Sequence, residues 1–177
     1  MNAKKINNNF EPYKRVVKFA GSAIIVLLEL AAYYYVWMDC YNRNMTVAFW
    51  RRGNWLIAGE YLILSLVLHR LYGGLKVGIY KYWTLVYSHM LSIVGVNAFS
   101  YVQVVLFDKK MHNPAALLGL TALDFVMVLL WALAFKKIYA AMFPKRRLLL
   151  IYGKKPMFHL VNRIDTRDDK YEIAENI

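Results

Sequence analysis

Three acidic residues of this sequence lie inside long apolar blocks, where an ionisable side chain is costly. They are Glu29, Glu60 and Asp124. Inside a membrane such groups usually face other helices and pair with a polar partner. We expect the side chains of Glu29 and Asp124 to be protonated or paired.

Further polar residues share one face of the apolar block that begins at residue 83. They are His89, Ser92, Asn97, Ser100 and Gln103. At 3.6 residues per turn, these five positions fall within about 140° of one another. Such a polar seam could bind a lipid phosphate or conduct an ion. Alternatively, its members make interhelical hydrogen bonds, each contributing on the order of 1 kcal/mol, and we favour this second interpretation. The intramembrane candidates are therefore Glu29, Glu60, His89, Asn97 and Asp124.

The sequence contains no complete catalytic or metal-binding motif. A P-loop, G-x-G-x-x-G, G-x-S-x-G, H-E-x-x-H and paired Cys or His at metal spacing are all missing. We therefore expect no catalytic residue, no metal ligand and no cofactor in this chain. His69, His112 and His159 are isolated from one another and are not interpreted as metal ligands. The single cysteine, Cys40, cannot form an internal disulfide and is interpreted as unreactive.

Composition and block length predict four transmembrane helices. Of the 177 residues, 59% are hydrophobic and 16% are aromatic, whereas soluble domains are about 45–50% apolar. Long apolar blocks with almost no charge are typical of helices that span a bilayer. The predicted spans cover residues 17–37, 55–71, 83–107 and 115–135, and the last helix is expected to continue toward Phe143. An aromatic belt at the outer headgroups is predicted from Tyr33, Tyr34, Tyr35 and Trp37.

The distribution of basic residues predicts that both ends lie in the cytoplasm. The inner segments would hold Lys4, Lys5, Lys14, Arg15, Lys18, Arg70, Lys76, Lys81, Lys136, Lys137, Lys145, Arg146 and Arg147. The outer loops would hold Arg43, Arg51, Arg52, Lys109 and Lys110. Basic residues concentrate on the cytoplasmic side, although Arg51 and Arg52 weaken the bias. If residues 55–71 failed to span, the C-terminus would lie outside instead.

The basic residues that follow the last span are expected to contact lipid headgroups. They are Lys136, Lys137, Lys145, Arg146 and Arg147. The net charge of +12 would also suit nucleic acid, but we find no basic recognition helix or known module. We therefore expect the lipid bilayer, and no nucleic acid, as the partner.

The last part of the chain predicts the opening of an α/β domain. Residues 147–153 predict a buried strand, 156–163 have helical spacing, and 171–174 predict a second strand. About thirty residues cannot bury a core alone, so we expect the chain to stop just inside this domain. Lys154 and Lys155 could meet an anion at the first turn, but solvated turn lysines are favoured. The predicted parts are a basic cytoplasmic N-terminus (1–15), a four-helix transmembrane domain (16–143) and an incomplete cytoplasmic α/β unit (144–177).

This arrangement resembles a known family. Four spans, a basic linker and the segment RRLLLIYGKKPMFHLVNRIDTRDDKYEI (146–173) are similar to the polyprenyl-phosphate hexose-1-phosphate transferases of bacterial exopolysaccharide and capsule synthesis. The likeness in architecture covers the whole chain. In sequence it is sharpest from Arg146 to Ile173, at the strand LLLIYG, the helix after Pro156 and the segment RDDKYEI.

The resemblance implies transfer of a sugar 1-phosphate from a nucleotide sugar to undecaprenyl phosphate in the bacterial inner membrane. In that family a four-helix membrane region precedes a Rossmann-like domain, and a catalytic domain that uses Mg²⁺ and an Asp-Glu pair comes last. This sequence has no Asp-Glu dipeptide, so no catalytic residue is carried over. Mg²⁺ is expected only for the missing catalytic domain.

Three functions are compatible with these observations. The first is the membrane-anchoring and oligomerising region of such a transferase, inactive alone, with undecaprenyl phosphate as a partner. The second is a small four-span transporter or flippase partner for lipid-linked sugars, similar to the GtrA-like group, and the third is a non-catalytic membrane scaffold. A face of small residues at Ala115, Gly119 and Ala122 suits close packing, either within the chain or in a homo-oligomer.

Overall fold

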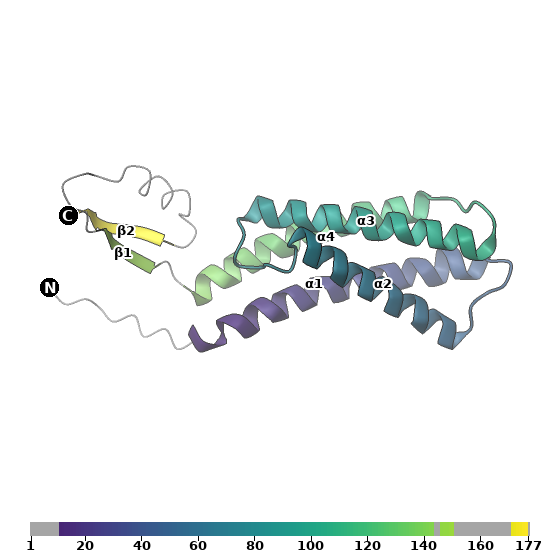
Figure 1. Ribbon diagram of the computed structural model, residues 1–177, viewed down its shortest axis with the longest axis horizontal. Helices are drawn as coiled ribbons and strands as arrows, with labels where there is room; N and C mark the ends of the chain where they lie inside the picture. Colours follow the sequence, from purple (N-terminus) through teal and green to yellow (C-terminus); the bar gives the residue numbers. More distant parts are fainter. Residues whose placement is uncertain (1–10, 144–145, 151–170, 177) are drawn as a thin grey trace. The chain divides into compact units, whose positions relative to one another are not determined.

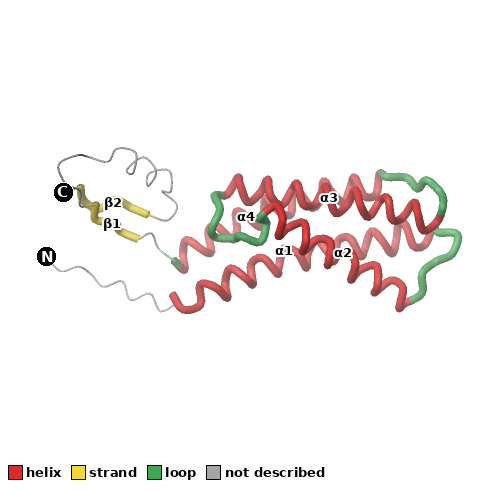
Figure 2. The backbone as a smooth tube through the Cα atoms, viewed as in Figure 1, coloured by secondary structure: helices red, strands yellow, loops and turns green. Residues whose placement is uncertain are grey.

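Four long helices form most of the protein. The computed structural model describes residues 11–143, 146–150 and 171–176. Its long helices are α1 (Lys14–Val36), α2 (Arg51–Tyr72), α3 (Tyr82–Asp108) and α4 (Ala115–Met142) (Figure 1). Each is long and apolar enough to cross a membrane, and short connections join them (Figure 2). The prediction of four helices that are long and apolar enough to span a membrane is confirmed.

Residues 13–136 make up one compact unit, a bundle whose helices run alternately up and down (Figure 1). At one end, the Ser22 hydroxyl of α1 donates to the carbonyl of Leu75 in the α2–α3 loop over 3.2 Å. At the other end, the Tyr41 hydroxyl donates to the carbonyl of Asn113, before α4, over 3.1 Å. The loops therefore tie each end of the bundle to a neighbouring helix.

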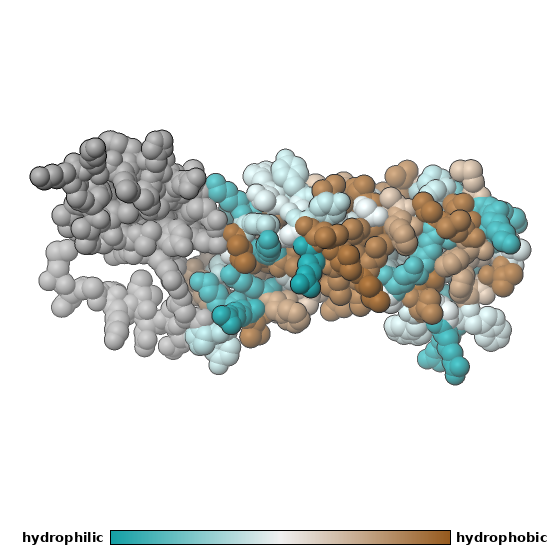
Figure 3. Space-filling view, viewed as in Figure 1, coloured by the Kyte–Doolittle hydropathy of each residue, from teal (hydrophilic) through white to brown (hydrophobic). Residues whose placement is uncertain are grey.

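The outer surface of the bundle is apolar, as a bilayer requires. Large hydrophobic side chains such as Leu27, Ile63, Leu118 and Leu130 are each more than half exposed. Figure 3 shows such side chains gathered over the middle of the helices on the visible face. The helices satisfy their own backbone hydrogen bonds, which is what a segment surrounded by lipid needs.

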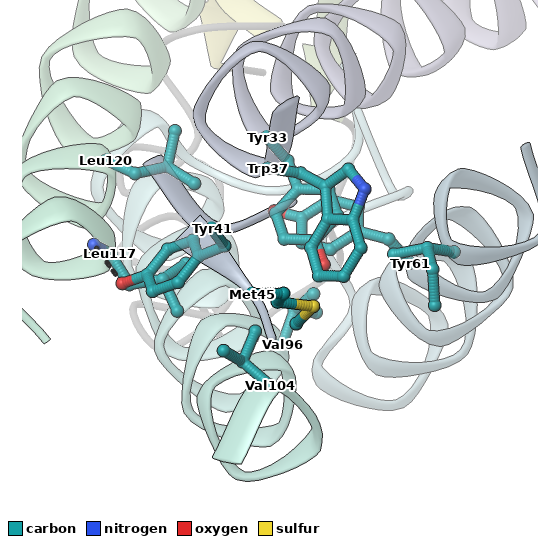
Figure 4. Close-up of a cluster of buried hydrophobic side chains, with 10 residues drawn as sticks. Tyr33, Trp37, Tyr41, Met45, Tyr61, Val96, Val104, Leu117 and Leu120 are labelled. Atoms are coloured by element: carbon teal, nitrogen blue, oxygen red, sulfur yellow. Dashed lines mark hydrogen bonds between the residues drawn. The ribbon is translucent and has the colours of Figure 1, made fainter. Parts of the chain in front are cut away.

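The interior holds two apolar clusters. One contains Tyr33, Trp37, Tyr41, Met45, Ile57, Tyr61, Val96, Val104, Leu117 and Leu120. The other contains Ile25, Val26, Val86, Ile93, Val128 and Ala132. Figure 4 shows Tyr41 reaching from the end of the first helical segment toward Leu117 of α4, whose backbone N–H donates to the tyrosine hydroxyl over 3.3 Å. Along α1 and α4, Glu29 and Asp124 fall between residues of the two clusters, so a polar layer interrupts the apolar core.

Two members of the predicted aromatic belt lie in this core, so the belt is wrong for them. Tyr33 stacks on Tyr61 with ring centroids 3.8 Å apart, and the Trp37 indole N–H donates to Asn54 Oδ1 over 3.0 Å. Tyr35, by contrast, is 71% exposed. Depth in the membrane suggested a belt, but the helical face decides which ring meets lipid. Tyr33 and Trp37 follow Glu29 at steps of four residues and so continue the buried stripe of α1 into η2.

The helix of the first span continues through a π-helical turn, η2 (Trp37–Tyr41), and a 3₁₀ turn, η3 (Asn42–Asn44). Residues 45–50, which lead to α2, are in neither a helix nor a strand. The Asn42 side chain holds the loop in place, because its amide donates to the Phe49 carbonyl over 3.2 Å and its Oδ1 accepts from the Phe49 N–H over 2.6 Å.

The C-terminal unit contains two strands, β1 (Arg146–Leu150) and β2 (Tyr171–Asn176), which pair in parallel. The register pairs Arg146 with Tyr171 and shifts by one residue after Leu148. Both strands were predicted: β1 starts one residue earlier than expected, and β2 starts at Tyr171 as expected. The helix predicted between them, together with Lys145, Lys154, Lys155 and His159, lies outside the described residues.

Candidate functional site

Three ionisable side chains from three helices meet inside the bundle. Glu29 Oε1 of α1 lies 3.5 Å from His69 Nε2 of α2 and 3.6 Å from His89 Nδ1 of α3. The two imidazole nitrogens are 2.9 Å apart. All three residues are at most 1% exposed. We call these three residues the Glu-His-His cluster.

Helical spacing explains how each member reaches the interior. Each one continues a buried stripe on its helix at steps of three or four residues. On α1 the stripe is Ser22, Ile25, Val26, Glu29 and Tyr33; on α2 it is Ile57, Ala58, Tyr61, Ser65 and His69; on α3 it is Leu85, Val86, His89, Ser92 and Val96. The three stripes face one another, which brings the polar members into contact.

Contacts with the carbonyl and the hydroxyl of Ser65 fix the orientation of the His69 ring. His69 Nδ1 lies 2.9 Å from the carbonyl oxygen of Ser65 and 3.2 Å from its hydroxyl. A carbonyl can only accept, so the hydrogen of this ring nitrogen points to Ser65. In the neutral ring, the lone pair is then on Nε2 and faces Glu29 and His89.

The α2–α3 loop and α4 close the cluster. Gly73 ends α2 in the left-handed conformation, with φ of 84°, and Gly74 follows it against the rings. A Cβ at Gly74 would lie 2.8 Å from Cδ2 of His69 and 3.5 Å from Cδ2 of His89. On the α4 side, the Trp131 ring lies 5.4 Å from the His89 ring between centroids. Glycine is therefore required for the loop to approach so closely.

A second buried group joins α2, α3 and α4 through Asn97. The Tyr61 hydroxyl donates to Asn97 Oδ1 over 3.1 Å. The Asn97 amide donates to Thr121 Oγ1 over 2.9 Å and to Asp124 Oδ2 over 3.4 Å. Asp124 is fully buried and close enough to Glu29 for the two carboxyl groups to interact electrostatically.

Three buried polar atoms have no hydrogen-bond partner among the described residues. They are Oε1 of Glu29, Nε2 of His89 and Oδ1 of Asp124. A buried polar atom without a partner is costly, and such atoms are few in native proteins. Of the two that belong to the Glu-His-His cluster, Glu29 Oε1 has only the longer contacts of 3.5 and 3.6 Å to the two imidazoles, and His89 Nε2 is the ring nitrogen that does not make those contacts.

Of the five polar candidates predicted from the sequence, four are buried inside the bundle and one lies at its surface. Glu29, His89, Asn97 and Asp124 lie in the interior, and Glu29 is paired as expected. Glu60 is half-buried instead, beside an apolar groove on the bundle surface lined by Leu56, Ile63, Val67 and Phe99. Its carboxylate accepts a hydrogen bond from the side-chain amide of Gln103. Gln103, which was predicted to share the polar face of α3, is therefore not among its buried members.

His69 is the member that sequence reasoning did not single out. It was interpreted only as isolated from His112 and His159, yet α2 continues to Tyr72 and the His69 ring is fully buried beside His89. The available signal was the spacing of Tyr61, Ser65 and His69, which places three polar side chains on one face.

Another histidine, His112, lies at the opposite end of the bundle. Its Nε2 is 2.8 Å from Asp108 Oδ2, and the other Asp108 oxygen accepts the Thr46 N–H over 2.8 Å. Asp108 thus links the α1–α2 connection to the α3–α4 connection. Among the basic residues proposed to contact headgroups, Lys136 and Lys137 are exposed on α4.

Two imidazoles and one carboxylate with ligand atoms within 4.8 Å of one another can share protons by hydrogen bonding or can bind a metal ion. Comparisons with protein-family models, with curated proteins and with solved structures each gave no match to this chain. The resemblance to the sugar-phosphate transferases therefore stays a prediction.

Proposed function

We propose that this chain is the membrane-anchoring region of an enzyme that transfers a sugar 1-phosphate from a nucleotide sugar to undecaprenyl phosphate. Its role is to hold a catalytic domain at the inner leaflet of a bacterial inner membrane, where both substrates meet. The chain alone contributes no catalytic residue, and Mg²⁺ belongs to the catalytic domain.

The observation that carries the proposal is the parallel pair β1–β2 after the last of four apolar helices. Parallel strands cannot be joined by a tight turn and need a crossover of a dozen or more residues. Residues 151–170 separate β1 from β2 and provide enough length. A bundle followed by the first crossover of an α/β domain is the order that the transferase resemblance implies.

The membrane orientation belongs to the same proposal. An up-and-down bundle of four helices brings the start of α1 and the end of α4 to the same membrane side, and the excess of Lys and Arg favours the cytoplasm for that side. Cysteine introduced at Arg52 or at Lys76, in a Cys40→Ser background, tests this orientation. A membrane-impermeant maleimide added to intact cells should label position 52 and spare position 76, and the reverse pattern would contradict it.

Self-association is part of the proposed anchoring role. Ala115, Gly119 and Ala122 are exposed on α4, so this face does not pack within the described bundle. Small residues allow helix backbones to approach closely in lipid, which leaves the face accessible to a second copy. Exchange of Gly119 for leucine should reduce crosslinking between differently tagged copies in membranes.

The polar interior does not favour the transport alternative. Tyr61, Asn97, Thr121 and Asp124 bond to one another across three helices, which is the pattern of interhelical hydrogen bonding. Loss of lipid-linked sugar movement in Asp124→Asn, with priming intact, would favour transport instead.

The reading frame beyond Ile177 and the activity of its product test the proposal. Membranes carrying the complete gene product should transfer labelled sugar phosphate from one of a panel of nucleotide sugars to undecaprenyl phosphate. The same product with its Asp-Glu pair changed to Asn-Gln is the inactive control, and residues 1–177 alone should also be inactive. A stop codon directly after Ile177, or transfer by residues 1–177 alone, would contradict the proposal.

A further inference from the structure

The spacing of the Glu-His-His cluster is close to that of ligands around one metal ion. For a tetrahedral ion with bonds of about 2.0–2.2 Å, neighbouring ligand atoms lie about 3.3–3.6 Å apart. Glu29 Oε1 is 3.5 Å from His69 Nε2 and 3.6 Å from His89 Nδ1. The remaining distance, between the two imidazole nitrogens, is 2.9 Å and needs to open by only about 0.5 Å.

The orientation of His69 suits a ligand. Metal-binding histidines usually donate their second ring N–H to a carbonyl or carboxylate, which leaves the lone pair of the other nitrogen facing the ion. The Ser65 carbonyl, 2.9 Å from His69 Nδ1, plays this part. Its effect is to aim the lone pair of Nε2 at the two other members of the cluster.

Charge gives an independent reason for a cation here. Glu29 Oε1 has no hydrogen-bond partner among the residues that the structure describes, and Asp124 lies within electrostatic range. Buried carboxylates in a membrane need a compensating charge or partner. A divalent ion bound by Glu29 and two neutral imidazoles would supply that charge.

The donor types select the class of metal. Imidazole nitrogens suit zinc, iron, copper and nickel, whereas magnesium and calcium prefer all-oxygen sites. We propose that Glu29, His69 and His89 bind one divalent transition-metal ion of the zinc and iron class inside the bundle. Three protein ligands leave a coordination position for a further ligand. The site does not depend on the transferase assignment.

Metal content of purified protein tests this site. The chain is produced without a polyhistidine tag, stripped with a chelator in detergent and incubated separately with Zn²⁺, Mn²⁺, Mg²⁺ or, without oxygen, Fe²⁺. After desalting, mass spectrometry of the elements should find about one Zn²⁺ or Fe²⁺ per chain and no retained Mg²⁺. The arm with the higher occupancy identifies the preferred ion.

Variants of the three proposed ligands test whether the retained metal is bound at the Glu-His-His cluster. Glu29→Gln, His69→Gln and His89→Gln should each weaken binding by more than about 100-fold, since loss of an outer partner alone costs about 10–100-fold. His112→Gln is the matched control, because that histidine also pairs with a carboxylate, over 2.8 Å, but lies outside the cluster. It should keep the wild-type stoichiometry. Gel filtration and far-UV circular dichroism check that each variant is folded.

If a variant does not fold, the metal content of the wild-type chain still tests the proposed site. Retention of about one ion after desalting, with a rise in the unfolding midpoint that a chelator reverses, supports the site. Wild-type protein that retains no transition metal would overturn the proposal, and the cluster would then be a set of proton-sharing hydrogen bonds. Equal metal content in folded ligand variants would mean adventitious surface binding and would overturn it as well.

Discussion

Replacing Gly74 by alanine should destabilise the bundle through the two histidine rings beside it. The new Cβ would lie 2.8 Å from Cδ2 of His69, closer than a side-chain contact allows. The His69 ring cannot retreat, because it is fully buried and its two nitrogens lie 2.9 Å from the Ser65 carbonyl and from the His89 ring.

The expected change in the free energy of unfolding follows from two opposing effects. Overpacking in a dense interior costs about 1–3 kcal/mol, while loss of glycine freedom in the unfolded chain returns about 0.4–1 kcal/mol. We therefore expect a net loss of about 1–2 kcal/mol in the free energy of unfolding. Displacement of the His69 ring should also lower metal retention by the Glu-His-His cluster.

Unfolding in mixed micelles, followed by circular dichroism at increasing SDS, measures this effect. Gly59→Ala is the matched control, because a Cβ at this position meets nothing within 4 Å. It should be neutral or stabilising by up to about 1 kcal/mol. Wild-type stability in Gly74→Ala would refute the close contact between the loop and the rings.

Two further substitutions test the rest of the interior in the same unfolding assay. Tyr61→Phe removes the hydroxyl that donates to Asn97 over 3.1 Å and should cost about 0.6–1.7 kcal/mol. The control Tyr35→Phe, at an exposed position, should be neutral. Equal effects of the two substitutions would contradict the contact between Tyr61 and Asn97. Trp37→Phe removes the donor to Asn54 over 3.0 Å and should cost about 1–3 kcal/mol through the lost bond and the smaller ring; an unchanged unfolding midpoint would argue against a buried Trp37.

Features that depend on one helix at a time were predictable from the sequence. Length and low charge gave the four spans within a few residues, and the 3.6-residue repeat gave the inward face of α3. His89, Ser92, Asn97 and Ser100 are all at most 3% exposed. The same periodicity, applied to α1, would have placed Tyr33 and Trp37 inside instead of in a belt.

Features that depend on the register between helices were not predictable. His69 and His89 are twenty residues apart and meet only because the chain turns at Gly73 and Gly74 and places α2 beside α3. Periodicity identifies the face of each helix but not the height at which two faces meet. For the same reason the pairing of Glu60 with Gln103 at the surface of the bundle was not predicted.

The most direct test of the Glu-His-His cluster is a double-mutant cycle on the free energy of unfolding between Glu29→Gln and His69→Gln. Residues in contact show coupling energies of about 0.5–3 kcal/mol, whereas distant pairs add to within about 0.3–0.5 kcal/mol. The 3.5 Å separation of Glu29 Oε1 and His69 Nε2 predicts coupling of about 1 kcal/mol or more for this pair and none between Glu29→Gln and His112→Gln. Additive effects of Glu29→Gln and His69→Gln would contradict the cluster.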